Sequence, residues 1–160
     1  MSTTDLAPRT DHLDSAVPDA YRSLLAAGKA AGKAALDSGL DMLLVELVRI
    51  RSSQLNGCAF CLRMHTRDAI AHGEVADRLA VLPAWRDSAY FSLTERAALA
   101  VAEEITLVAD HQSGRRTPAV DAEIDPSALT PEQLAAVQWL AIVINAFNRI
   151  SIASHYDVAP

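Results

Sequence analysis

Several features that mark specialised classes of protein are missing from this 160-residue sequence. It has no uninterrupted apolar run of roughly 18–20 residues, the length of a membrane-spanning helix. Its first residues, MSTTDLAPRTDHLD, do not combine a basic stretch with an apolar one, as a secretory signal does. Lys and Arg are not clustered and the formal net charge is −6, whereas nucleic-acid binding needs a basic patch. We therefore expect a cytoplasmic protein that binds neither membranes nor nucleic acids.

Cysteines and aromatic residues are scarce as well. The chain has two cysteines, and aromatic residues make up 5% of it, while 51% of its residues are hydrophobic. A chain of this length fits one domain and buries roughly 68–70% of the surface that its unfolded form exposes. It therefore needs no disulfide to hold a core, and we predict a single domain over residues 1–160.

Strands are not predicted either, because no segment alternates apolar and polar residues over the length of a strand. Apolar residues instead recur at helical spacing, and Gly, Pro and N-capping patterns separate the segments. The sequence therefore predicts an all-α fold, a compact multi-helix bundle. The expected helices span residues 18–36, 41–53, 58–72, 74–82, 92–110 and 130–154. The remaining segments are expected to be a flexible N-terminal arm (1–17), an aromatic loop (83–91) and a connector (112–128).

The two cysteines, Cys58 and Cys61, form a C-x-x-C pair directly after the helix-breaking dipeptide Asn56-Gly57. The break places both in the first turn of the next helix, three residues apart on one face. Unpaired N–H groups and the helix dipole at that position favour a thiolate, the reactive form of cysteine. A disulfide between them would close a very small loop and add little stability. In a cytoplasmic protein such a pair is more often catalytic or metal-binding than structural.

A histidine and a glutamate complete the candidate site. His65 lies four residues after Cys61 on the same helix face and can take up and release protons near neutral pH. Glu46 lies on a partly apolar side of the preceding helix, and partly buried carboxyl groups with a raised pKa cluster at functional sites. The two helices can pack as a hairpin, so that Glu46 could reach His65 or Cys58.

Other interpretations of these four residues are open from the sequence. The cysteines can be small buried hydrophobic side chains, and Glu46 can simply pair with Arg49 or Arg51. Two Cys and one His can also bind zinc, with Glu46 or water as the fourth ligand, although no second C-x-x-C or paired His follows. Covalent haem attachment is excluded because Leu62, not His, follows the second cysteine. A non-enzymatic redox switch would use the same thiols without turnover.

The segment ELVRIRSSQLNGCAFCLRMHTRDA, which begins at Glu46, resembles the core motif of the alkylhydroperoxidase D-like, carboxymuconolactone decarboxylase superfamily. The later segments RLAVLPAWRDSAYFSLTERAALAVAEEIT and INAFNRISIASHY are similar to the continuation of that family. The resemblance covers about residues 39–155. It implies an all-helical fold with the active site on a helical hairpin, assembly as a trimer or hexamer, and peroxidase activity. We expect neither a cofactor nor a metal.

By position, the resemblance implies that Cys61 is the peroxidatic thiolate and Cys58 the resolving thiol, with Glu46 and His65 as a proton relay. It implies a hydroperoxide substrate and a dithiol reductant, of the lipoyl type or a thioredoxin-like protein. One position departs from the pattern: the hydroperoxidases of the family carry His immediately before the second cysteine, and this chain has Phe60. The decarboxylase branch generally lacks the C-x-x-C, so decarboxylation is not expected.

Two further groups are interpreted as structural. The aromatic residues of segment 83–91 are expected to pack in the core or in a subunit contact. Asn145, Asn148 and Arg149 lie on one face of an otherwise apolar helix. Because buried amides need partners, we expect them to form a hydrogen-bond network or an oligomer contact.

Overall fold

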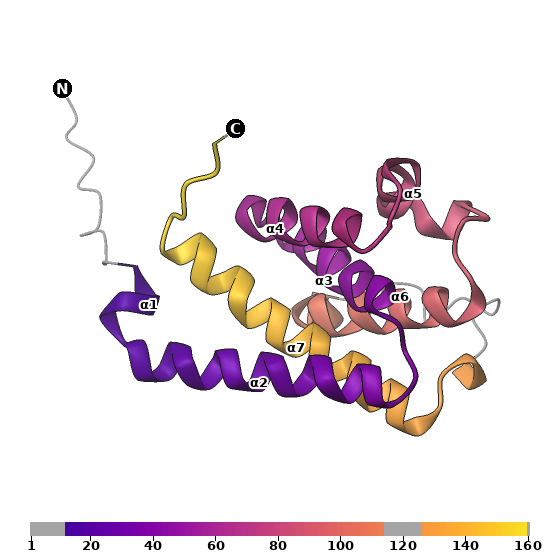
Figure 1. Ribbon diagram of the computed structural model, residues 1–160, viewed down its shortest axis with the longest axis horizontal. Coiled ribbons are helices and arrows are strands. Elements are labelled where there is room, and N and C mark those ends of the chain that lie inside the picture. The colour runs from indigo at the N-terminus through magenta and orange to yellow at the C-terminus, as the bar shows by residue number, and fades with distance from the viewer. Residues whose placement is uncertain (1–11, 114–125, 160) are drawn as a thin grey trace.

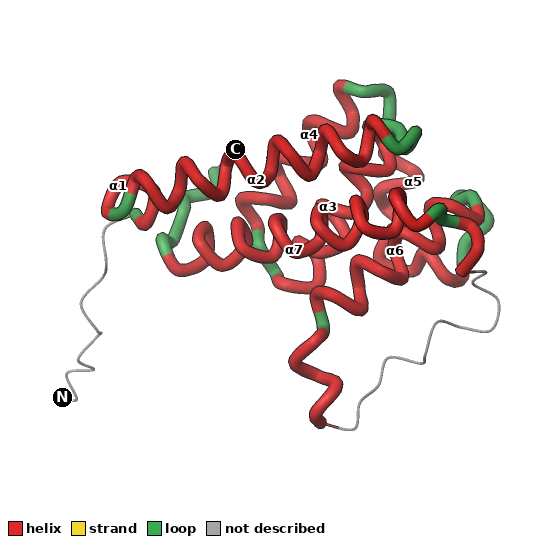
Figure 2. The backbone as a smooth tube through the Cα atoms, turned by 90° about the horizontal axis from the view of Figure 1, so that it is seen from below, coloured by secondary structure: helices red, strands yellow, loops and turns green. Residues whose placement is uncertain are grey.

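The computed structural model describes residues 12–113 and 126–159 of the chain. Every regular element in these ranges is a helix (Figures 1 and 2), which confirms the predicted all-α fold. The α-helices are α1 (Leu13–Ala16), α2 (Pro18–Asp37), α3 (Met42–Asn56), α4 (Ala59–Ala71), α5 (Ala76–Val81), α6 (Leu93–Thr106) and α7 (Pro131–Ala153). These ranges also hold the short 3-10 helices η1 (Leu82–Asp87), η2 (Val108–Ser113) and η3 (Pro126–Ala128).

Helix α3 forms the centre of the bundle. It packs against α4, α6 and α7, and α7 in turn lies alongside α2 (Figure 1). None of the residues of α3 is exposed, and its buried positions occur on several sides of the helix. A helix covered in this way has no wide polar stripe facing water. Functional side chains on α3 therefore act from inside the protein.

Local signals set the helix ends as the sequence predicts. Ser92 opens α6 and Thr130 opens α7, and each forms a capping box with the residue three positions later, which satisfies two backbone N–H groups. Helix α3 ends at Gly57, whose φ of 66° is the left-handed conformation that glycine adopts without strain. This turn lets α4 fold back against α3 as the predicted hairpin.

Three predicted segments differ most from the structure. The helix predicted over 41–53 continues to Asn56, because the left-handed glycine stops it there. Segment 83–91 is only partly a loop, since η1 covers its first half and carries Trp85 completely into the core. Helix α6 ends at Thr106, and η2 takes over the last residues of the range predicted for it.

The predicted flexible arm, residues 1–17, is wrong for its last part. Leu13–Ala16 form α1, and the backbone N–H of Leu13 donates to Ser154 Oγ at 3.0 Å, so that α1 meets the end of α7. Residues 1–11 lie outside the described residues, as do residues 114–125 of the predicted connector. The single domain over 1–160 stays a prediction.

Helix α7 is, among the described residues, the helix that is long and apolar enough to cross a membrane. Half of its most apolar stretch is buried inside the protein. Core helices commonly have the same length and composition, so this feature is weak evidence for a membrane span.

A second buried carboxylate, Glu103 on α6, ties η1 to the core. Its Oε1 accepts hydrogen bonds from Arg51 Nε at 2.7 Å and from Trp85 Nε1 at 2.9 Å, and its Oε2 accepts one from Arg86. Burial alone would raise the pKa of Glu103, but the three donors and the charge of Arg51 outweigh burial and lower it. The carboxylate is therefore charged, and its hydrogen bonds connect α6 with α3 and η1.

Replacing Glu103 by Gln should lower the free energy of unfolding at neutral pH by roughly 3 kcal/mol, because a buried ion pair loses one partner. Glu104→Gln, at the exposed neighbouring position, is the matched control and should change it by less than about 0.5 kcal/mol. The lowered pKa means that the stabilisation by Glu103 is present above its ordinary pKa of 4.5 and is lost as the pH falls below it. Urea unfolding of both variants should therefore show a Glu103→Gln effect that shrinks in acid. Equal effects of the two substitutions would contradict this role.

Candidate active site

The two cysteines lie at the corner between α3 and α4. Cys58 is the N-cap of α4, and its Sγ accepts a hydrogen bond from the backbone N–H of Cys61 at 3.4 Å. Both cysteines are free thiols and both are buried. They pack together with Ile144 of α7, with Phe60 and Phe147 at the edge of this small cluster. The sequence-predicted pair is thus held on one side of the corner, facing α7.

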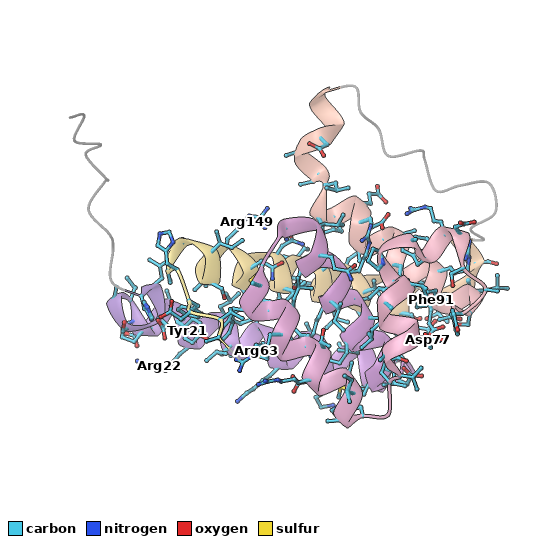
Figure 3. The ribbon with its side chains drawn as sticks, turned by 90° about the horizontal axis from the view of Figure 1, so that it is seen from above. Tyr21, Arg22, Arg63, Asp77, Phe91 and Arg149 are labelled. Carbon is cyan, nitrogen blue, oxygen red and sulfur yellow. The ribbon has the colours of Figure 1, made fainter. Side chains whose placement is uncertain are left out.

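The two thiols differ in their surroundings. Cys61 lines a cavity of about 690 Å³, and Cys58 is not among the residues that line it. Most of its wall is apolar and comes from α2, α4 and α7. The wall includes Leu25, Phe60, Leu140, Val143, Ile144 and Phe147. Tyr21 of α2 also lines it, at the end of the molecule opposite Asp77 and Phe91 (Figure 3). Cys61 can therefore meet a molecule bound in the cavity, while Cys58 contacts Cys61 from the corner.

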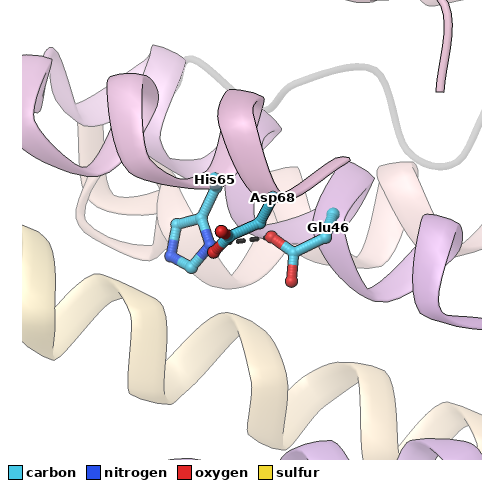
Figure 4. Close-up of side chains that lie close together, drawn as sticks. All are labelled: Glu46, His65 and Asp68. Atoms are coloured by element: carbon cyan, nitrogen blue, oxygen red, sulfur yellow. Dashed lines mark hydrogen bonds and ion pairs between the residues drawn. The ribbon is translucent and has the colours of Figure 1, made fainter. Parts of the chain in front are cut away.

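The buried carboxylate of Glu46 joins α3 to α4. Its Oε2 lies 2.7 Å from Nδ1 of His65 (Figure 4), and its Oε1 accepts a hydrogen bond from Arg49 at 2.6 Å. The side chains of Glu46 and His65 are only 3% and 8% exposed. Glu46 thus makes both of the contacts that the sequence left as alternatives, the one with His65 and the one with Arg49.

The charge state of Glu46 fixes the tautomer of His65. Burial alone would raise the pKa of Glu46, as the sequence predicts, but the hydrogen bond from His65 and the charge of Arg49 outweigh it and lower the pKa. The expectation of a raised pKa is therefore wrong. An ionised carboxylate only accepts hydrogen bonds, so Nδ1 of His65 carries the proton toward Glu46. Nε2 is then the acceptor nitrogen, on a ring that lines the same cavity as Cys61.

The thiol of Cys61 is held in its neutral form at rest. Burial is the largest cause that raises its pKa, to about 11, and Cys58 adds to the rise, while hydrogen bonding by Ser151 and Asn148 lowers it. The expectation that the first helical turn favours a Cys61 thiolate is wrong. Burial outweighs the position in the helix, and the Cys61 N–H group of the first turn is directed to the sulfur of the N-cap residue, Cys58. A proton acceptor is therefore needed to activate Cys61.

A polar network behind the cysteines joins α3 to α7. Asn56 Nδ2 donates to Oδ1 of Asn145 at 2.9 Å and of Asn148 at 2.8 Å. Asn148 Nδ2 donates to Ser53 Oγ at 3.0 Å, and Arg149 donates to the backbone and side-chain oxygens of Asn145. The structural hydrogen-bond network predicted for these amides is confirmed.

Sequence reasoning missed one residue of the site, Ser151 on α7. Its Oγ lies 3.7 Å from Cys61 Sγ, and the residue is buried and lines the cavity. The signal in the sequence was its spacing of three from Asn148, which places both on one helix face. A serine in an Ala- and Ile-rich helix gives no sign by itself of a thiol opposite.

The potential metal ligands differ from the zinc set that the sequence allowed. Among the described residues, the side chains that could share an ion are Glu46, His65 and Asp68 (Figure 4), and neither cysteine belongs to this group. Asp68 is exposed. A cation there would compete with Arg49 for Glu46. The arrangement suits proton transfer better than metal binding.

Comparison with known proteins agrees with these observations. A model of the carboxymuconolactone decarboxylase family matches residues 18–104. The uncharacterized protein YdfG of Bacillus subtilis is 39% identical over 116 residues, which cover 72% of this chain and 76% of that protein. A crystal structure of a protein of unknown function from Agrobacterium tumefaciens, named as a candidate antioxidant defence protein AhpD, has a TM-score of 0.75 at 24% identity. The superposition covers 94% of this chain and 99% of the Agrobacterium protein, so the two chains share a fold.

The neutral state of Cys61 gives a testable pH dependence. In the Cys58→Ser variant, where Cys61 is the only thiol, alkylation by a small neutral reagent should rise about tenfold per pH unit. It should level off above the ordinary pKa but below about 11, because burial remains while the contribution of Cys58 is removed. The same variant unfolded in urea is the control and should level off near the ordinary value of about 8.5. Quantitative mass spectrometry measures both profiles. A folded-state plateau at or below the unfolded one would contradict the effect of burial.

Proposed function

The chain belongs to the carboxymuconolactone decarboxylase family and has the alkylhydroperoxidase D-like fold, and on this premise we propose that it is a thiol-dependent hydroperoxide reductase. The observation that carries the proposal is that Cys61 and His65 line one cavity while Glu46 fixes the histidine tautomer. The C-x-x-C favours this activity over decarboxylation. The apolar wall favours an organic hydroperoxide over hydrogen peroxide as the substrate.

The reaction begins with proton transfer from Cys61 to Nε2 of His65, whose positive charge Glu46 stabilises. The thiolate attacks the terminal oxygen of the hydroperoxide, the O–O bond breaks, and Cys61 becomes a sulfenic acid. The alkoxide takes the proton from His65 and leaves as an alcohol. The proton that Cys61 gives up thus returns to the leaving alkoxide through His65.

The resolving step uses Cys58, which already contacts the backbone of Cys61. Its sulfur attacks the sulfenic sulfur, a disulfide forms, and the hydroxyl group leaves with the Cys58 proton as water. A dithiol reductant, of the lipoyl type or a thioredoxin-like protein, then supplies two electrons and two protons by thiol–disulfide exchange. Phe60 stands where the family's hydroperoxidases carry an additional His, and its ring packs edge-on against Tyr156 with the ring centroids 5.0 Å apart. Because Phe60 cannot transfer a proton, the proposed relay consists of Glu46 and His65.

The proposal extends to the assembly and the compartment. We propose a homo-oligomer, a trimer or hexamer, as the family resemblance implies. Trp139 and Ile142 of α7 are 57% and 46% exposed, and large apolar side chains on one helix face are what a subunit interface covers. We propose a cytoplasmic location, where dithiol reductants keep such a pair reduced.

Titration with an organic hydroperoxide tests the chemistry directly. The reduced protein should lose both thiols on addition of about one equivalent and recover them with dihydrolipoamide, since one disulfide forms per peroxide. Cys61→Ser should keep the Cys58 thiol, and Cys58→Ser should stop at the Cys61 sulfenic acid. Free-thiol counting and mass spectrometry measure these outcomes. Survival of both thiols in the unaltered protein would sink the proposal, and a single oxidation without turnover would indicate a redox switch.

Replacing Glu46 by Gln tests the relay. The first oxidation of Cys61 should slow by about a hundredfold or more, because a general base loses the charge that supports it. The control is Glu104→Gln, which removes an equal charge from the surface and should leave the rate unchanged. Stopped-flow oxidation at neutral pH measures both, after thermal melting shows that the variants are folded. An unchanged rate in folded Glu46→Gln would remove Glu46 from the relay.

A further inference from the structure

Ser151 is a buried hydroxyl of α7 that the steps above do not use. Its Oγ lies 3.7 Å from Cys61 Sγ, within hydrogen-bonding distance for sulfur, and it reaches the thiol from the helix opposite the α3–α4 corner. Serines within helices often bond back to the carbonyl oxygen one turn earlier, as Thr106 does to Ala102 at 2.7 Å. The hydroxyl of Ser151 instead has the Cys61 sulfur as its partner.

We propose that Ser151 is a catalytic residue that donates its hydroxyl proton in a hydrogen bond to the Cys61 thiolate. In the resting thiol state either atom can donate, because both S–H and O–H groups can rotate. Once Cys61 loses its proton, its sulfur can only accept. The hydroxyl then turns toward the sulfur, and the proton stays on Ser151 throughout.

The surroundings give the thiolate few donors: Ser151 and Asn148 are the side chains whose hydrogen bonds lower the Cys61 pKa. The Cys61 backbone N–H points to the Cys58 sulfur, and the adjoining cluster is made of Ile144, Phe60 and Phe147. Burial there favours the neutral thiol, and a charged acceptor strengthens any hydrogen bond that it receives. A hydrogen bond from the Ser151 hydroxyl in this environment therefore stabilises the thiolate more than the thiol.

The polar network on α7 holds Ser151 in place. Asn148, three residues earlier on the same face, bonds to both Asn56 and Ser53 at the end of α3. Because α3 leads into the corner that carries Cys61, the same contacts fix the thiol and the hydroxyl relative to each other. Asn148 thus positions the pair, in addition to its own effect on the Cys61 pKa.

Thiol ionisation tests this role independently of turnover. In the Cys58→Ser background, Ser151→Ala should raise the apparent pKa of Cys61 by about one unit, the effect of losing one hydrogen bond to a charged group. Alkylation at a fixed pH below that pKa should slow about tenfold. Ser52→Ala is the control, because Ser52 is buried but its Oγ has no hydrogen-bond partner among the described residues, and it should leave the apparent pKa unchanged.

A second pair of variants guards against a merely structural effect. Ser151→Thr keeps the hydroxyl and adds a methyl group, and Ser151→Val has nearly the same shape as Thr with a methyl group in place of the hydroxyl. Thr should restore the apparent pKa of Cys61, and Val should show the same rise as Ala. Equal apparent pKa values in the Thr and Val variants, or no rise in folded Ser151→Ala, would overturn the proposal.

The role of Ser151 in catalysis rests on the proposed peroxidase function, and the two can fail separately. If Cys61 ionisation depends on Ser151 but the protein does not consume hydroperoxide, the peroxidase proposal fails and the hydrogen bond stands. If hydroperoxide oxidises Cys61 at the same rate in the Thr and Val variants while the peroxidase cycle works, the role of Ser151 fails alone.

Discussion

The bond between the buried carboxylate of Glu46 and His65 is the interaction on which the arrangement of the site depends. Glu46 lies on a helix with no exposed residue, so its charge must be satisfied by side chains. Arg49 supplies one donor from the same helix, and His65 supplies the other from α4. That second contact joins α3 to α4 in the hairpin that follows the left-handed turn at Gly57. The same contact therefore fixes helix packing, histidine tautomer and the approach of His65 to the cavity.

Comparison of the two buried glutamates shows what makes one of them chemically useful. Glu103 accepts hydrogen bonds from two arginines and a tryptophan, none of which can change its protonation in a catalytic cycle. Glu46 accepts from one arginine and one histidine, and the histidine can take up a second proton. Both carboxylates have a lowered pKa for the same physical reason. The identity of the donor, not the burial of the acid, distinguishes the structural carboxylate of Glu103 from the carboxylate of Glu46 in the proposed proton relay.

The part of the site that short-range pattern reveals is its α3–α4 hairpin. The break at Asn56-Gly57, the spacing of Cys58 and Cys61, and the capping boxes are local signals, and the structure follows them. Contacts between segments far apart in the chain were not predictable in the same way. Ser151 lies 90 residues from Cys61 in sequence, and no periodicity specifies which thiol a helical serine will meet. The direction of the Glu46 and Cys61 pKa shifts could not be predicted from the sequence pattern either. It depends on whether hydrogen-bond donors and nearby charges outweigh the effect of burial, and these contacts come from the tertiary structure.

For a peroxidase of the proposed kind, the neutral resting thiol is compatible with selective chemistry. A thiolate exposed at a helix N-terminus reacts with many oxidants in solution, whereas Cys61 is almost completely buried. Its proton must first move to a histidine on the same cavity wall, and the resulting charge must find donors within that wall. A substrate that fills the apolar cavity excludes water from these steps, and exclusion of water strengthens each hydrogen bond to the sulfur. Activation is then coupled to occupancy of the cavity, which favours organic hydroperoxides large enough to occupy it.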